Sequence, residues 1–129
     1  MPFLKSKFVP ETHFLHTLAE LPVDLDNYVL KPLFSFAGMG VIIDVTADDI
    51  RGIADPENWI LQKKVVYEPV VKAPDGGVKV EIRLMYLWAD NAEPKLCINL
   101  VRLSRGKMIG VRYNKDFDWV GGTIGLMEK

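Results

Sequence analysis

Lys31 stands at the end of a short apolar run, and small residues follow it at positions where backbone could cradle a phosphate. The run 28–30 is rich in β-forming residues and a proline follows the lysine, so we expect Lys31 at the terminus of a strand. Ser35, Gly38 and Gly40 then supply backbone that can adopt positive φ and approach a ligand closely. The spacing matches neither the P-loop nor the Rossmann pattern. The stretch predicts a phosphate cradle, with an ordinary glycine-containing hairpin as the alternative.

Glu81 and Arg83 lie two residues apart in an apolar stretch, so a strand would place both side chains on one face. The guanidinium could bind a phosphate and the carboxylate a metal ion. The alternative is a surface ion pair that contributes little to stability. Arg102 ends the next expected strand, and antiparallel pairing would bring it near the same face.

Other chemistry-bearing groups carry weaker signals. His13 and His16 are three residues apart in an expected helix but lack further metal ligands at a suitable spacing, so we expect them on the solvent side. Asn114, Asp116 and Asp118 lack the glycine and the terminal glutamate of a calcium loop. The sequence also contains no arrangement of residues typical of a Ser–His–Asp or Cys–His catalytic site.

The elements that must position these residues are short. We expect a helix from about Glu11 to Glu20, a hairpin over 27–45 and a capped helix from 47 to about 53. Strands are expected over 59–67, 70–73, 78–88, 95–103 and 108–113, followed by a loop with a glycine pair. The outline predicts an α+β fold: one domain, 1–129, with a largely antiparallel sheet and two short helices.

Composition narrows the function classes. The chain has 129 residues, 49% hydrophobic and 26% charged, with a formal net charge of −1. That charge gives no general attraction to nucleic acid or an anionic membrane, and the candidates for a local basic patch are Arg102, Arg105, Lys107 and Arg112. A single cysteine, Cys97, excludes an internal disulfide and is expected in the core. With no apolar run of roughly 20 residues and no signal peptide, we expect a cytoplasmic protein without a membrane partner.

Taken in order, five segments resemble the nucleotide-binding region of the ATP-grasp ligases, especially the branch with the ribosomal-protein glutamate ligases and glutathione synthetase. The first two are YVLKP and SFAGMGV, which resemble the phosphate-binding lysine strand and the mobile glycine-rich flap. The others are WILQKKV, EIRLMYLW and LVRLSRGKMIGVRYNKDFDWVGG, which resemble the hinge strand, the [DE]-I-R strand and the later segment with arginine, asparagine and a glycine pair.

The resemblance implies a role for each matching residue. Lys31 would contact the nucleotide phosphates under the flap, the hinge would line the adenine, and the arginines would neutralise the γ-phosphate and an acyl phosphate. It assigns nucleotide binding to Lys31, Ser35, Gly38, Gly40, Gln62, Lys63, Val65 and Asn114, catalysis to Arg83 and Arg102, and a magnesium ligand to Glu81. It also implies that the flap, Ser35–Met39, is the least ordered hairpin when no nucleotide is bound.

The implied activity is ATP-dependent ligation of a carboxylate to an amine or thiol through an acyl phosphate, with ATP and Mg²⁺ as cofactors and a small-molecule or peptide carboxylate as substrate. Such a reaction depends on positioning and charge neutralisation and needs no nucleophilic side chain. The domain that precedes the lysine strand in the family and the later E-x-N metal segment have no match here. We therefore expect an excised or reduced portion that is incomplete for catalysis.

Two alternatives remain open. The same scaffold could be a non-catalytic interaction module that forms a homo-oligomer through exposed strand edges. The weaker alternative is a small β-rich domain outside the family, whose arginines bind an anionic ligand or RNA. The net charge of −1 argues against a nucleic-acid partner.

Overall fold

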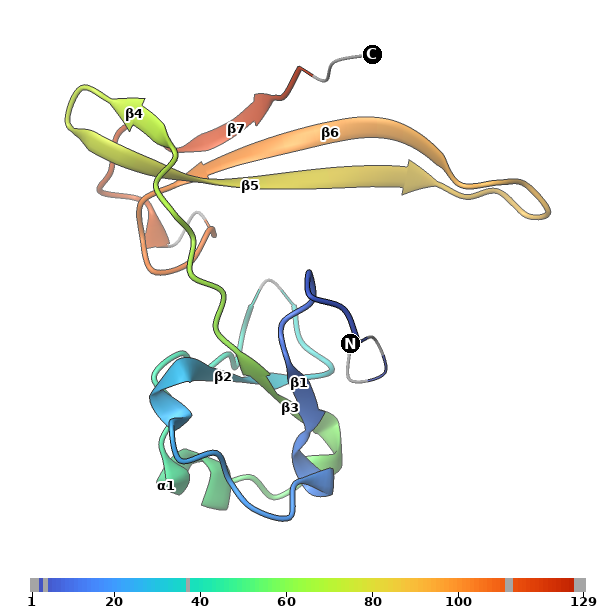
Figure 1. The fold of residues 1–129 in the computed structure, drawn as a ribbon, viewed down its shortest axis with the longest axis vertical. Coiled ribbons are helices and arrows are strands. Elements are labelled where there is room, and N and C mark those ends of the chain that lie inside the picture. The colour runs from blue at the N-terminus through green and yellow to red at the C-terminus, as the bar shows by residue number, and fades with distance from the viewer. Residues whose placement is uncertain (1–2, 4, 37, 111–112, 127–129) are drawn as a thin grey trace. The chain divides into compact units, whose positions relative to one another are not determined.

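The computed structural model describes residues 3, 5–36, 38–110 and 113–126. The chain divides into two compact units, the N-terminal unit Met1–Val66 and the C-terminal unit Tyr67–Lys129. Each unit contains its own antiparallel sheet (Figure 1). The expected single domain stays a prediction, because two compact units can belong to one domain. Among the described residues, no helix has the length and apolar character needed to cross a bilayer.

The sheet of the N-terminal unit has three strands in the order β1-β3-β2. These are β1 (Thr12–Phe14), β2 (Tyr28–Pro32) and β3 (Trp59–Lys63), all paired antiparallel. Beyond β2 the expected hairpin is closed by a single bridge, in which the backbones of Leu30 and Ile42 exchange two hydrogen bonds of 2.9 Å. The expected return strand after the glycine loop is therefore reduced to one paired residue.

Helical structure in this unit is brief. The one α-helix of the described chain is α1 (Ala47–Arg51), and its capping box is formed as predicted, with the Thr46 side chain accepting from the Asp49 backbone. Three 3₁₀ turns accompany it: η1 (Leu15–Thr17), η2 (Leu25–Asn27) and η3 (Pro56–Asn58). The predicted α+β class is confirmed in its coarse form, a mixed fold of mostly antiparallel sheet, and its ATP-grasp assignment stays a prediction.

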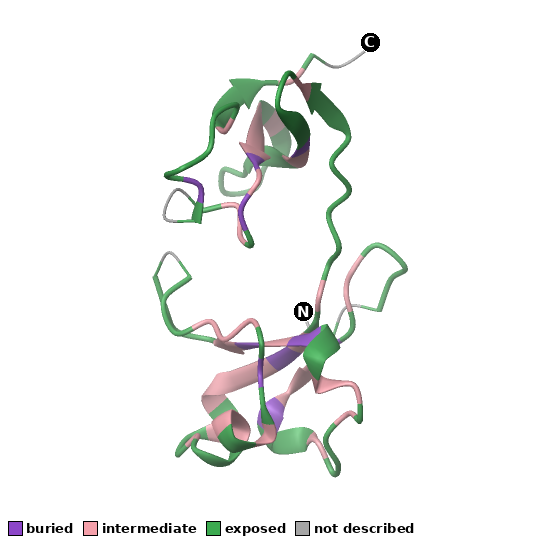
Figure 2. Ribbon diagram, turned by 90° about the vertical axis from the view of Figure 1, so that its left-hand side faces the viewer, coloured by how far each residue is buried: buried purple, intermediate pink, exposed green. Residues whose placement is uncertain are grey.

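One face of the β1-β3-β2 sheet forms a hydrophobic core. Leu30 and Leu61 lie opposite each other on β2 and β3 and have no exposed surface. Buried residues concentrate on these strands, as the purple segments show (Figure 2). The other buried members of the cluster are Leu15, Tyr28 and Val45.

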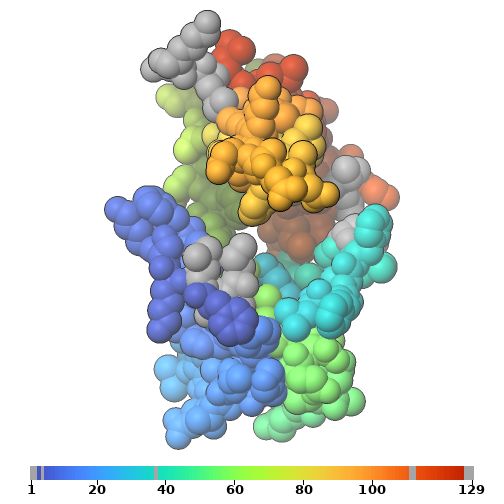
Figure 3. Space-filling view, turned by 90° about the vertical axis from the view of Figure 1, so that its right-hand side faces the viewer, coloured from blue at the N-terminus to red at the C-terminus, as the bar shows by residue number. Residues whose placement is uncertain are grey.

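The sheet of the C-terminal unit has four strands in the order β4-β5-β6-β7. They are β4 (Val71–Ala73), β5 (Gly76–Leu87), β6 (Lys95–Ser104) and β7 (Gly121–Ile124), all antiparallel. The β5–β6 pairing confirms the predicted long hairpin, whose side chains lie at the surface in the space-filling view, coloured yellow to orange (Figure 3). Among the described residues of this unit, the buried ones are Val78, Ser104, Gly106 and Asn114.

The expected helix at residues 11–20 is wrong. Thr12–Phe14 pairs with β3 as a strand, and a single 3₁₀ turn follows it. Pairing with β3 satisfies the backbone of this segment, whose β-branched Thr12 suits a strand. Leu15 still reaches the core from the turn, with Leu18 packed beside it, so the apolar spacing that indicated a helix is also compatible with one turn.

Three expectations for the C-terminal unit are also wrong. The described residues 108–110 do not form a strand, and the rest of that expected strand includes residues 111–112, which lie outside the described residues. The segment expected as a loop contains β7, which pairs with β6. Cys97 is exposed rather than in the core. It is the extra residue where the β5–β6 register shifts, between partners Leu96 and Ile98.

Candidate functional site

Lys31 lies on the face of the N-terminal sheet opposite the core. Tyr28 and Leu30 point into the core, so alternation along β2 turns Lys31 to the other face. Its Nζ donates to Gln62 Oε1 at 2.6 Å, and Gln62 Nε2 donates to Thr12 Oγ1 at 2.8 Å. The structure thus joins two predicted site residues, Lys31 and Gln62, in a hydrogen-bonded row across all three strands.

The electrostatics of Lys31 distinguish it from a surface lysine. Burial removes water from the ammonium group and lowers the pKa of Lys31 below its ordinary value. Its hydrogen-bond acceptor is a neutral amide, and no described carboxylate forms an ion pair with it. A partly desolvated cation without a counter-ion can gain strongly from an anionic ligand.

The glycine loop begins directly after β2. Gly38 and Gly40 have φ of 75° and 74°, as expected for backbone in the left-handed region. Gly40 also lies against Pro32, where an added Cβ would come within 3.1 Å of its ring. Ser35 is exposed, and no hydrogen bond within the described chain uses the N–H groups of Ser35, Gly38 or Gly40. Ala37 lies outside the described residues, so the predicted low order of the flap stays a prediction.

The three residues assigned to the adenine are placed differently. Gln62 points to Lys31, and the Lys63 backbone N–H donates to Glu11 O at 2.8 Å. Val65 follows β3, and its backbone forms no hydrogen bond with described residues. The backbone groups of Val65 are therefore unbonded within the described chain, whereas the Gln62 side chain already bonds to Lys31 and Thr12, and the assignment of these residues to the adenine stays a prediction.

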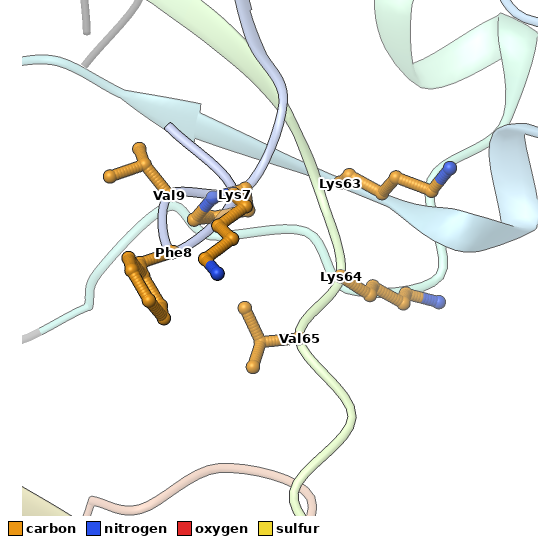
Figure 4. Close-up of a pocket in the computed structure, with 7 residues that line it drawn as sticks. Lys7, Phe8, Val9, Lys63, Lys64 and Val65 are labelled. Atoms are coloured by element: carbon orange, nitrogen blue, oxygen red, sulfur yellow. The ribbon is translucent and has the colours of Figure 1, made fainter. Parts of the chain in front are cut away.

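Lys63 and Val65 line a shallow cavity of about 280 Å³ together with the N-terminal arm (Figure 4). The ammonium ends of Lys63 and Lys64 point away from Lys7 and Val65. Lys64 Nζ donates instead to Asp26 O at 2.5 Å. Of the three ammonium groups, only that of Lys7 lies beside Phe8 and Val65, and the rest of the lining consists of apolar groups and lysine stems. Its full lining is Lys7, Phe8, Val9, Pro10, Lys63, Lys64 and Val65.

In the C-terminal unit, Glu81 lies directly opposite Arg102 in the β5–β6 pairing. Arg102 Nε and a second guanidinium nitrogen contact Glu81 Oε1 at 2.9 and 2.7 Å, and Arg83 contacts the same oxygen at 3.1 Å. This confirms the predicted shared face and the predicted approach of Arg102. Two guanidinium groups share one carboxylate, so the cluster keeps an excess positive charge.

Asn114 organises the loop that follows β6. Its Oδ1 accepts from Ser104 Oγ and from the backbone N–H groups of Arg105 and Gly106 at 2.8–3.1 Å. Its Nδ2 donates to two carbonyl oxygens, those of Met108 and Gly110, each at 2.9 Å. The side chain is buried and its donors are fully engaged. This geometry gives Asn114 a structural role, and its assignment to nucleotide binding stays a prediction.

A second cavity, of about 250 Å³, brings Arg102 and Asn114 together. It lies between β6, the loop that Asn114 holds and the glycine pair of β7. Arg102 is the one charged residue of the lining, which otherwise consists of Leu103, Ile109, Asn114, Val120, Gly121 and Gly122. The cavity lining therefore carries one charge, that of the Arg102 guanidinium, which also contacts Glu81.

The donor set around Glu81 does not suit Mg²⁺. The ion prefers several oxygen ligands, whereas the Glu81 oxygen that makes contacts is bound by two arginines. No group of three or more His, Cys, Asp or Glu side chains in the described chain could hold a metal ion.

Sequence reasoning missed Thr12 and the pair Asp75–Arg105. Thr12 was expected in a helix, although its β-branched side chain two residues after Pro10 favours a strand. Arg105 Nη1 binds Asp75 Oδ2 at 2.5 Å, and this hydrogen bond lowers the pKa of Asp75. Its position in a turn gave no signal of that partner.

Comparison of the chain with protein-family models, with curated proteins and with solved structures finds no match.

Proposed function

We propose that this chain is the ATP-binding portion of a carboxylate–amine or carboxylate–thiol ligase that works through an acyl phosphate. The observation that carries the proposal is Lys31. Its ammonium is partly buried, hydrogen-bonded to the neutral Gln62 amide, and without a carboxylate partner in the described chain. A phosphate would supply the missing negative charge, and the adjacent glycine loop offers N–H groups that bond to no described residue.

The Arg83–Arg102 cluster supports the same proposal from the C-terminal unit. Both guanidinium groups lie on one sheet face, and their single shared carboxylate leaves them net positive. Guanidinium groups bind phosphate oxygens in paired hydrogen bonds, which suits the charge that develops in phosphoryl transfer. We assign Lys31 to the nucleotide phosphates and the two arginines to the transferred phosphoryl group.

In the proposed reaction, a carboxylate oxygen attacks the γ-phosphorus of ATP and ADP leaves. An amine or thiol then attacks the acyl carbon, and inorganic phosphate leaves with the C–O bonding electrons. The side chains hold and neutralise charge, and none of them forms a covalent bond with the substrate. The acyl substrate is a small-molecule or peptide carboxylate.

The test is the thermal stabilisation of the full chain by a non-hydrolysable ATP analogue. A ligand that binds only the folded state raises the melting temperature. Lys31→Met should weaken analogue binding at least about tenfold, because it removes a charge-assisted hydrogen bond while keeping the stem. Lys72→Met, at an exposed strand position, is the matched control and should bind like the wild type. No shift with the wild type at millimolar analogue would overturn the proposal.

The arginines and the predicted metal are tested separately. Arg102→Gln should weaken ATP-analogue binding more than AMP binding, because only ATP presents the γ-phosphate. The Mg²⁺ dependence of analogue binding should be unchanged in Glu81→Gln, since Glu81 is bound by arginines. If analogue binding by Glu81→Gln no longer depended on Mg²⁺, Glu81 would be a metal ligand after all.

A further inference from the structure

The outer edge of β5 is largely unpaired. β4 pairs with β5 only at Gly76–Val78, whereas β5 continues to Leu87. Beyond Val78, no other described strand lies on this side of β5. A strand edge with free N–H and C=O groups is a template for another strand.

Two structural features limit the stretch that another strand can use. At one end β4 already occupies Val78. At the other end the β5–β6 register shifts between Met85 and Tyr86, and such an irregularity increases the local twist, so we expect a partner strand to leave the edge there. The regular free edge therefore runs from Lys79 to Met85, and Ile82 is its midpoint.

The sequence of this edge is complementary to itself about the same midpoint. If a second copy pairs antiparallel about a twofold axis at Ile82, Glu81 lies opposite the partner's Arg83, and Arg83 opposite the partner's Glu81. Opposite charges in directly opposed positions stabilise a sheet, and like charges destabilise it. An axis at Glu81 or at Arg83 would instead oppose two glutamates or two arginines. Geometry and charge thus select the same register independently.

The other face of the edge is apolar. Ile82 and Leu84 are 64% and 48% exposed in the single chain. In the selected register Ile82 meets the partner's Ile82, and Leu84 meets the partner's Val80. Pairing would remove these side chains from water, which favours association. On the charged face, the row would read Arg102, Glu81 and the partner's Arg83.

We propose that two copies of this chain form a dimer in which β5 pairs antiparallel with the partner's β5 through Lys79–Met85, centred on Ile82. The two four-stranded sheets then become one continuous sheet. This inference does not depend on nucleotide binding, and the experiments below require no nucleotide.

Charge reversal tests the association. In sedimentation velocity, Arg83→Glu and Glu81→Arg should each dimerise at least about tenfold more weakly than the wild type, because each opposes like charges. A one-to-one mixture of the two variants should recover dimers, since both charged pairs that oppose each other across the dimer are then complementary. Circular dichroism checks that each variant folds. A monomeric wild type, or variants that dimerise like the wild type, would overturn the proposal.

Cysteine cross-linking tests the register without changing the charges. In a Cys97→Ser background, Ile82→Cys should form a disulfide-linked dimer under mild oxidation. Directly opposed residues lie about 4.5–5.5 Å apart between Cα atoms, within disulfide range. Leu84→Cys is the matched control, because its copies would be four residues out of register, roughly 13 Å apart. Cross-linking through Leu84→Cys, or absence of cross-linking through Ile82→Cys, would overturn the register.

Discussion

The two units use different means to hold an antiparallel sheet. The N-terminal sheet buries one face, where Leu30 and Leu61 are completely enclosed. The C-terminal sheet buries Val78 and little else of its apolar surface, and Ile82 and Leu87 are among its exposed side chains. Its loop after β6 is instead held by the buried amide of Asn114. A hydrophobic core stabilises the first unit, whereas strand pairing and one polar centre stabilise the second, which leaves apolar surface for association.

The largest expected effect is in the N-terminal core. Leu61→Ala should destabilise this unit by about 2–5 kcal/mol, because it removes a fully buried side chain and leaves a cavity. Leu84→Ala, on exposed β5, is the matched control and should cost less than about 1 kcal/mol in monomer. Urea denaturation measures the loss in free energy of unfolding, and hydrogen exchange measured peptide by peptide shows which unit is destabilised. Equal losses of stability in the two variants would contradict the contrast between the buried N-terminal core and the exposed C-terminal sheet.

The polar centre of the C-terminal unit should give the next largest effect. Asn114→Ala removes five hydrogen bonds to described residues and leaves buried backbone groups unpaired, each worth roughly 1–3 kcal/mol. We expect at least about 2 kcal/mol of destabilisation confined to this unit. Lys115→Ala, at the exposed neighbouring position, should change little. The measurement is hydrogen exchange of residues 104–110. If the amides of this loop were as well protected in the variant as in the wild type, the structural role of Asn114 would be contradicted.

A smaller effect is expected at the helix cap of the N-terminal unit. Thr46→Ala breaks the capping box with Asp49 and should cost about 1 kcal/mol. Because α1 has five residues, exchange in its amides should increase before the sheet is affected. Simultaneous loss of protection in β3 would mean that the helix and the core unfold as one unit.

The smallest effect concerns pH and Lys31. Since burial lowers its folded-state pKa, the unfolded chain binds the proton more tightly, and stability rises with pH toward the ordinary pKa of 10.5. Lys31→Met should abolish this rise, and Lys72→Met should retain it. Tyr28 contributes a slope of opposite sign near its ordinary pKa of 10.0, because burial, then Glu11 and Asp24, raise its folded-state pKa, and this contribution is common to both variants. Urea denaturation below pH 10.0 measures the slope, and an unchanged slope in Lys31→Met would contradict the assignment.

Local signals predicted much of the fold. The capped helix after Thr46 and the strands expected over 78–88 and 95–103 each depend on patterns of neighbouring residues, and each is confirmed with its ends shifted by at most two residues. The shared face of Glu81 and Arg83 followed from the two-residue period of a strand. The helix expected near Thr12 failed because apolar spacing does not report whether a distant strand offers a partner.

The sequence by itself determined the mixed α+β composition, the hairpin turns and the residues with the chemistry to bind an anion. Only the tertiary structure decided that Thr12, Lys31 and Gln62 form one row, that Arg102 opposes Glu81, and that Asn114 lies in a buried loop. The physical reason is that side-chain type and local period are properties of adjacent residues. Strand order, register and desolvation arise from pairing between segments far apart in the chain.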